Sequence, residues 1–208
     1  AEDGWSLKKL HRRIMLSAVY QQGAIENSDA RIVDPDNKLL WRMPRRRLEF
    51  EAMRDSMLAV SGELTTEIGG RPFDLLSKPV QPRRTIYGFV NRDIVSDFAS
   101  TFDAANPNSC TATRPATNVP QQTLFALNSE FIQDRAAALA DVEEIVSADS
   151  DEDRIRILYK RAYSRMPERD ELQLAIRYVQ ADNGTSKTNS WYRLAHALLA
   201  SNEFIFVD

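Results

Sequence analysis

Residues 150–162 read SDEDRIRILYKRA and carry the clearest structural signal in the chain. Ser150 followed three residues later by Asp153 fits a capping box. In this motif each of the two side chains accepts a hydrogen bond from the backbone amide of the other residue. The apolar residues behind this cap recur at the spacing of one helix face: Ile155, Leu158, Tyr159 and Ala162. The stretch therefore predicts an amphipathic helix with one buried face.

Similar signals on both sides of this stretch predict six more helices. Each combines an apolar stripe with a polar cap or with a proline at the first helical position. Their expected starts are Ser6, Arg45, Asn91, Pro120, Pro167 and Ser190, and the expected stops include Gly62 and Asn183-Gly184. We expect an all-α fold, an irregular bundle of about seven helices with a long loop-rich central segment and at most one short hairpin.

The centre of the chain breaks the helical pattern. Glycines and prolines interrupt residues 63–90, where Thr85-Ile86-Tyr87 is the only plausible strand, and residues 105–119 show no periodicity. Further on, residues 141–153 carry carboxylates and no basic residue, which favours a solvated linker and a helix N-terminus. We expect a main helical domain over residues 1–140 and a three-helix segment over 141–208, packed together as one unit.

Composition narrows the class of protein. The 208 residues are 43% hydrophobic and 27% charged, which is typical of a soluble globular protein. The formal charge of -3 argues against a general nucleic-acid binder, and we expect no membrane span because no apolar run is long enough. Cys110 is the single cysteine, so an intrachain disulfide and a covalently attached c-type haem are both excluded. The helix cap at Ser6 comes so early that we expect the chain to be part of a longer protein.

Few patterns point to catalysis or to a bound metal. The spacing of a calcium loop occurs at Asp149, Asp151 and Asp153, but Arg154 stands where the loop needs glycine. The two histidines, His11 and His196, have no metal ligands at suitable spacing on their own helix faces. Nucleophile elbows and glycine-rich phosphate loops are absent from the sequence. We therefore expect no catalytic residue, no metal site and no cofactor in this chain.

A first arginine cluster is the best positive feature. Five arginines face Glu49 and Glu51 between residues 42 and 54, at Arg42, Arg45, Arg46, Arg47 and Arg54. The planar guanidinium suits carboxylate, sulfate or phosphate, so an anionic polysaccharide or an acidic partner is one interpretation. The other interpretation, which we favour, is pairing of Arg45 with Glu49 and of Arg47 with Glu51 along a helix.

A second polar cluster lies in and beside the irregular centre, at Arg83, Arg84, Tyr87, Arg114, Gln121 and Asn128. Irregular segments on a rigid scaffold often hold binding sites. Arginines and amides in long loops also bind the carbonyl groups of the loop itself. The sequence leaves both interpretations open.

Several long motifs run along most of the chain, among them GWSLKKLHR at 4–12, DPDNKLLWRM at 34–43, RRRLE at 45–49, PRRTIYGF at 82–89, VPQQ at 119–122, LNS at 127–129 and SNEF at 201–204. In these motifs the chain resembles the C-terminal part of a domain family that is abundant in planctomycete proteins and has no assigned function. That family is named from its association with planctomycete cytochrome c-like proteins. The resemblance implies a large exported parent protein, with a second domain upstream and no haem in this part.

Three hypotheses follow for function. The leading one is a non-catalytic helical module that binds an upstream partner domain or an anionic polysaccharide. The alternative is a hydrolase or redox enzyme whose pocket, lined by Arg83, Arg84, Tyr87 and Arg114, is completed by upstream domains. A purely structural domain is the third. If upstream domains cover the region of Trp5 and Trp41, the chain alone should expose an apolar patch there.

Overall fold

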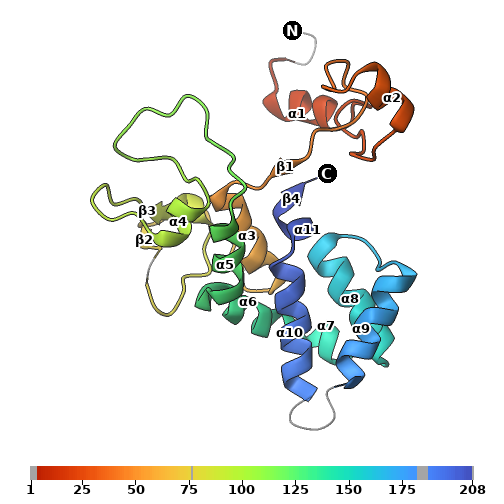
Figure 1. Cartoon of the computed structure of the whole chain (residues 1–208). Helices are drawn as coiled ribbons and strands as arrows, with labels where there is room; N and C mark the ends of the chain where they lie inside the picture. The colour runs from red at the N-terminus through yellow and green to blue at the C-terminus, as the bar shows by residue number, and fades with distance from the viewer. Residues whose placement is uncertain (1–3, 76, 182–186, 208) are drawn as a thin grey trace. The chain divides into compact units, whose positions relative to one another are not determined.

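A computed structural model of the protein describes residues 4–75, 77–181 and 187–207 (Figure 1). The chain divides into two compact units. Unit 1 consists of Ala1–Arg46 and Phe206–Asp208, and unit 2 of Arg47–Ile205. Each unit is described by itself below.

Unit 1 contains two short helices held between hydrogen-bonded turns. Helix α1 (Leu7–Met15) begins at Ser6, whose side chain accepts a hydrogen bond from the Lys9 amide, as the sequence predicts. Helix α2 (Ser28–Val33) was not predicted and is capped by the Asn27 side chain. The strands β1 (Arg46–Arg47) and β4 (Phe206–Val207) have two residues each and form a two-stranded sheet.

Unit 2 starts with helix α3 (Phe50–Val60), and this start corrects a prediction. The sequence predicts the helix from Arg45, but Arg46 and Arg47 are extended in β1. The predicted stop is confirmed, because Gly62 adopts a φ of +79°, a conformation that other residues rarely take.

The centre of unit 2 is irregular, as predicted, but its details differ. Thr85–Tyr87 is a single turn of 3-10 helix, η1, and the predicted strand there is wrong. Strands β2 (Phe73–Asp74) and β3 (Gly88–Phe89) form a parallel pair, so these strands make no hairpin. Helix α4 (Asp97–Thr101) is capped by Ser96, so the predicted start at Asn91 is wrong. Asn91 instead accepts a hydrogen bond from the Asp93 amide in a turn of its own.

The remainder of unit 2 is helical: α5 (Pro120–Asn128), α6 (Glu130–Ala140), α7 (Glu143–Val146), α8 (Asp151–Tyr163), α9 (Arg169–Ala181), α10 (Lys187–Leu199) and α11 (Asn202–Ile205). The first helical position of Pro120 and the cap at Ser150 are confirmed. Ser190 is not a cap, because α10 begins at Lys187, and the predicted stop at Asn183-Gly184 lies outside the described residues. The all-α class is confirmed, with eleven α-helices among the described residues.

The core of unit 2 lies where α6 packs against α10 and where α8 packs against α9 and α10. Its fully buried side chains include Ile132, Leu139, Ile155, Leu158 and Leu199. Burying each of these contributes roughly 1.5–3 kcal/mol. Beside α3, the ring of Phe98 contacts four other rings, those of Phe50, Phe102, Phe125 and Phe131. Within the described residues, no helix is long and apolar enough to cross a membrane.

Candidate functional site

The first arginine cluster does not form the predicted helical pairs. Arg47 is buried in unit 2, lies 2.5 Å from the Asp103 carboxylate and packs its guanidinium over the Phe102 ring. Glu51, the partner predicted for Arg47, instead binds Arg114 at 2.6 Å. Arg45 and Arg46 belong to unit 1 and are exposed.

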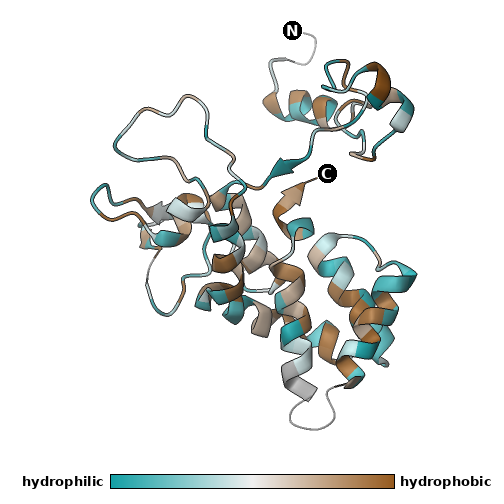
Figure 2. Ribbon diagram, in the orientation of Figure 1, coloured by the Kyte–Doolittle hydropathy of each residue, from teal (hydrophilic) through white to brown (hydrophobic). Residues whose placement is uncertain are grey.

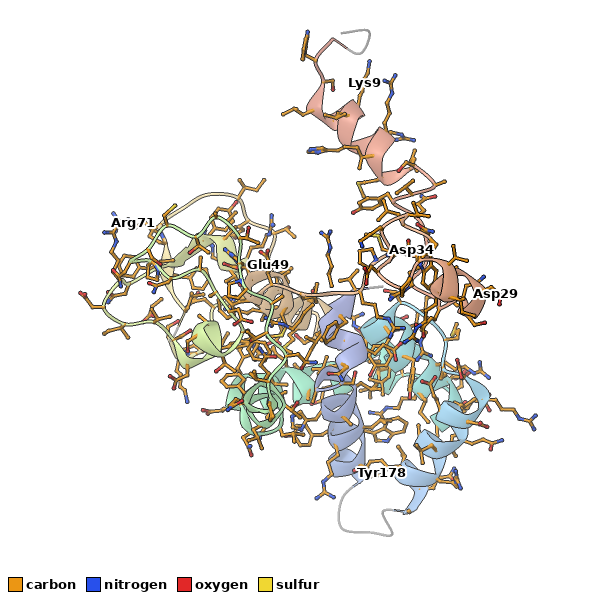
Figure 3. All side chains as sticks on the ribbon, turned by 45° about the horizontal axis from the view of Figure 1, so that its top comes forward. Lys9, Asp29, Asp34, Glu49, Arg71 and Tyr178 are labelled. Atoms are coloured by element: carbon orange, nitrogen blue, oxygen red, sulfur yellow. The ribbon has the colours of Figure 1, made fainter. Side chains whose placement is uncertain are left out.

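In the second cluster, Arg83 is bound by its own loop. Its guanidinium donates to the carbonyl oxygen of Arg71 at 2.8 Å and to that of Gly69, and it lies 5.1 Å from the centre of the Tyr87 ring. Figure 3 labels Arg71 in this irregular region. For Arg83, where the sequence leaves two interpretations open, the contacts favour the one in which a loop arginine binds its own loop, from residue 69 to residue 83.

Arg54, on α3, organises the same region, whereas the sequence analysis counted it only as a member of the first arginine cluster. Its guanidinium donates to the carbonyl oxygens of Gln81 at 2.8 Å and Arg83 at 3.1 Å and to the Thr85 hydroxyl at 3.2 Å. It lies between the rings of Phe73 and Phe131. Burial lowers the pKa of Arg54 to about 10. The sequence signal was only that an arginine falls among the apolar residues of the α3 stripe.

Asp55 completes this arrangement from the next position on α3. Its carboxylate accepts from the Thr85 amide at 2.7 Å and from the Thr85 hydroxyl at 2.6 Å. Arg84 lies 3.8 Å from the same carboxylate and is half exposed. Arg54, Asp55 and Thr85 therefore fix the turn η1 on α3.

The remaining residues of the second cluster do not converge. Gln121 is exposed in the first turn of α5, and Asn128, at the other end of that helix, donates to the Leu124 carbonyl at 2.8 Å. Arg114 lies in the loop after α4, where it binds Glu51 and, at 3.1 Å, Glu49. These carboxylates raise the pKa of Arg114 above its usual value.

Arg114 lines a cavity in unit 2, which we name the loop cavity. It encloses about 470 Å³ and is lined by residues of β2, β3, α3, α4 and the loop after α4. Its charged lining residues are Glu51, Asp74 and Arg114, and most of its remaining lining is apolar. A volume of this size lies within the range of roughly 300–1,000 Å³ that is typical of ligand sites.

The second cavity of unit 2 encloses about 390 Å³ beside the phenylalanine cluster. Arg135 lies in its wall, where it pairs with Glu63 at 2.8 Å and packs over the Phe131 ring. The exposed pair Lys78 and Glu130 also belongs to this wall. Because each of these cations has a carboxylate partner, the cavity shows no preference for the charge of a ligand.

The histidines and carboxylates form no cluster suited to a metal within the described part of the chain. His196 hydrogen-bonds through Nε2 to the Ala126 carbonyl at 3.0 Å and stacks on Tyr192. His11 is exposed on α1. These two contacts account for His196 as a helix residue whose ring is bound within the protein.

Unit 1 offers a different kind of candidate, an apolar surface that we name the α1 surface. Leu7, Leu10 and Ile14 are exposed by 69%, 49% and 48%, and Trp5 beside them by 87%. Figure 2 shows hydrophobic residues on both α1 and α2. The other residues of α1 are basic or sulfur-containing, Lys8, Lys9, His11, Arg12, Arg13 and Met15. Figure 3 shows the Lys9 side chain extending away from this helix.

These features define a predominantly helical module in which most of the predicted ligand-binding arginines are bound within the protein itself. The chain belongs to the PSD1 family, described as a protein of unknown function (DUF1553), whose match covers residues 1–179. Comparison with curated proteins and with solved structures gave no match.

Proposed function

We propose that this chain is a non-catalytic docking module of an exported multidomain protein, and that its α1 surface binds a partner domain of the same parent protein. The observation that carries this proposal is the exposed apolar surface of unit 1. The exported and multidomain context follows from the family resemblance found in the sequence motifs.

Unit 1 lacks the buried core that a folded unit of its size needs. Thirteen large apolar side chains between Trp5 and Leu40 are exposed, and Ala24 is the one buried hydrophobic residue among the described residues of this unit. Units of about 40 residues normally need disulfides, metals or a partner for stability. Covering Leu7, Leu10 and Ile14 would contribute roughly 1.5–3 kcal/mol for each side chain.

The charges of α1 indicate the chemistry of the partner. Lys8, Lys9, Arg12 and Arg13 lie on this helix, and it has no acidic residue in its first turn. An apolar groove rimmed by carboxylates complements such a helix in both shape and charge. A polysaccharide complements it less well, because hydroxyl-rich sugar rings do not replace the apolar contacts that leucine and isoleucine require.

The alternative, an active site completed by upstream domains, has less support. It requires Arg83, Arg84, Tyr87 and Arg114 to line one pocket, and of these only Arg114 lines either cavity described above. Arg83 is bound to loop carbonyls instead. These contacts are explained by their role in fixing the loop, and a catalytic role is not needed to explain them.

Hydrogen exchange tests the proposal by comparing this chain alone with the longer parent protein. We expect the α1 amides to exchange at least about tenfold more slowly in the parent, because docking suppresses local opening. The double variant Leu10→Glu/Ile14→Glu should abolish this protection. The matched control Leu174→Glu, at a 63% exposed position on α9, should leave it intact. Equal exchange rates in the chain and in the parent would refute docking through α1.

A further inference from the structure

We propose that the loop cavity of unit 2 binds an uncharged, largely apolar small molecule. This site is separate from the α1 surface and does not depend on the docking role of that surface. Three features of the lining favour this class of ligand: an apolar wall that reaches the core, polar side chains that are already bound, and a loop that is fixed in place.

The apolar wall of the cavity runs from the surface to the core. At the surface it consists of Phe89, Val90 and Ile94, which are exposed by 57%, 63% and 62%. At its inner end it includes Phe50 and Ala99, which are buried. A ligand that covers this wall removes apolar surface of the protein and of the ligand from water, and the gain in free energy grows with the apolar area.

The uncharged polar side chains among the described lining residues are bound within the protein. The Thr85 hydroxyl donates to a carboxylate of α3 at 2.6 Å, and the Ser96 hydroxyl accepts from an amide of α4 at 3.1 Å. The side-chain oxygens of Asn91 and Asn106 each accept from the amide two residues further on, at 2.9 Å. A strongly polar ligand would lose its water here, while the side chains that could replace the water already have partners.

The charges of the lining are already compensated. Arg114 binds Glu51 through two hydrogen bonds, at 2.6 and 3.1 Å. Asp74, the remaining charged residue among the described lining residues, is exposed to water and interacts within the protein. Because a charge that leaves water needs an opposite charge in return, the cavity favours a ligand without charge.

The wall formed by the loop after α4 is fixed by polar contacts. Ala105 and Pro107 line the cavity from this loop. Asp103 accepts a hydrogen bond from the Thr117 amide at 2.9 Å, which joins the two ends of the loop, and Arg114 attaches the loop to α3. The cavity of about 470 Å³ is thus preformed, and this lowers the entropy cost of binding a small molecule.

Two fluorescent probes with the same aromatic skeleton test this proposal on the full 208-residue chain. N-phenyl-1-naphthylamine is uncharged, and 8-anilinonaphthalene-1-sulfonate adds one sulfonate to the same skeleton. We expect saturable binding of the uncharged probe and at least about tenfold weaker binding of the sulfonate, because its charge gains no partner in the lining. In competition, 1-octanol should displace the uncharged probe at lower concentrations than octanoate or octylammonium does.

Variants establish that the probe binds in this cavity. Ile94→Ser, at an exposed position that does not threaten the fold, should weaken the uncharged probe about threefold or more by removing apolar contact area. Ala99→Leu fills the inner end and should weaken it about tenfold. Val80 lines the second cavity and not the loop cavity, so Val80→Leu is the matched control. Leu10→Glu is the control for the α1 surface, and neither control should change the affinity.

A further variant tests the role of charge compensation. Arg114→Met removes the cation and leaves Glu51 in the wall without this partner. Octylammonium should then displace the uncharged probe at about three- to tenfold lower concentration than it does from the unaltered chain, and high salt should reduce this gain. Arg177→Met, at an exposed position of α9, is the matched control and should leave the displacement unchanged.

Three results would overturn the proposal. Equal affinity for the uncharged probe and the sulfonate would show that the lining does not select against charge. Loss of binding in Leu10→Glu or Val80→Leu, with Ile94→Ser and Ala99→Leu unaffected, would assign the probe to the α1 surface or to the second cavity. Failure of the uncharged probe to bind would leave an apolar protein segment, rather than a small molecule, as the occupant of the loop cavity.

Discussion

Unit 1 and unit 2 are stabilised in different ways. Unit 2 has a continuous core in which Ile132, Leu139, Leu158 and Leu199 are buried. Unit 1 is held by hydrogen-bonded turns, for example where the Asp34 carboxylate accepts from the Lys38 and Leu39 amides at 3.0 and 2.7 Å. The difference teaches that satisfied turns can hold a unit whose apolar helix stays exposed, whereas unit 2 buries its apolar side chains in a core.

Many arginines of the protein are bound by internal partners. In unit 2 they lie over aromatic rings and bind internal acceptors: Arg47, Arg54, Arg83, Arg135, Arg154 and Arg165. Arg165, for example, binds the carboxylates of Glu171 and Glu203, which raise its pKa. In unit 1, Arg12 lies exposed on α1. Other arginines of unit 1 do make internal contacts, because Arg42 lies 5.1 Å from the centre of the Trp41 ring and Arg31 pairs with Glu26 at 2.7 Å.

The largest effect is expected at Arg54. The variant Arg54→Met should lower the free energy of unfolding of unit 2 by about 3–5 kcal/mol, because it leaves the carbonyl groups of Gln81 and Arg83 without their buried, charged donor. Denaturant unfolding followed through Trp191, which is 4% exposed, measures this loss. The control Arg84→Met, at a half-exposed position, should change stability by less than about 0.5 kcal/mol. Similar losses in both variants would show that Arg54 does not organise the region.

Gly88 should show the next largest effect, because a side chain there has no room. An added Cβ would lie 2.7 Å from Leu75 Cδ2 and 3.0 Å from the Thr85 carbonyl oxygen. We expect Gly88→Ala to destabilise unit 2 by about 1–3 kcal/mol. Leu75→Ala in the same chain should recover part of this loss, and Gly23→Ala, where the nearest atom is 4.0 Å away, is the control. An unchanged stability of unit 2 in Gly88→Ala would mean that β2 and β3 can move apart without a loss of stability.

Tyr163 should make the stability of unit 2 depend on pH in the alkaline range. Burial raises its pKa to about 12, above its usual value of 10.0. A raised pKa means that the folded state retains the proton more strongly, so this contribution is complete below pH 10 and is lost between about pH 10 and 12. Tyr163→Phe should remove this alkaline loss of stability. At neutral pH it should lower the free energy of unfolding by about 1 kcal/mol, because the hydrogen bond from Tyr163 to the Leu198 carbonyl is lost. Unfolding curves at several pH values would detect both effects, and an unchanged alkaline slope in the variant would contradict the assignment.

The smallest effect is expected on the α1 surface. Leu10→Glu should change the unfolding of the isolated chain by less than about 0.5 kcal/mol, because Leu10 already faces water. Leu139→Glu, at a fully buried position of α6, is the contrasting variant and should prevent unit 2 from folding. Circular dichroism measured during heating compares the unfolding of these two variants. A large loss from Leu10→Glu would show that unit 1 has its own core and would weaken the docking proposal.

Local patterns were sufficient to predict much of the fold. The caps at Ser6 and Ser150, the first helical position of Pro120 and the stop at Gly62 depend on interactions within a few residues, and all are confirmed. The start of α3 and the strand at Thr85 were predicted wrongly. In both places contacts with distant residues override the local preference, Arg47 with Asp103 and Thr85 with Asp55.

The candidate sites were harder to predict than the helices. An exposed apolar patch around Trp5 and Trp41 was expected if upstream domains cover that region; Trp5 and the apolar residues of α1 are exposed, whereas Trp41 is half-buried. The loop cavity was not expected, since its walls come from α3, α4, two short strands and a loop without periodicity. Arg114 was singled out only as a polar loop residue, and its attachment to Glu51 depends on a contact between distant parts of the chain.

The sequence by itself determined the helical class, some of the helix starts and the family, because these depend on short-range capping, spacing and motif order. Only the tertiary structure decided what the arginines do. A guanidinium is compatible with an external anion, a carboxylate, a loop carbonyl or an aromatic ring, and the choice depends on which of these the fold brings within reach. For Arg47, Arg54 and Arg83 the fold brings internal partners. The apolar residues of α1 are brought no such partner, and they remain exposed.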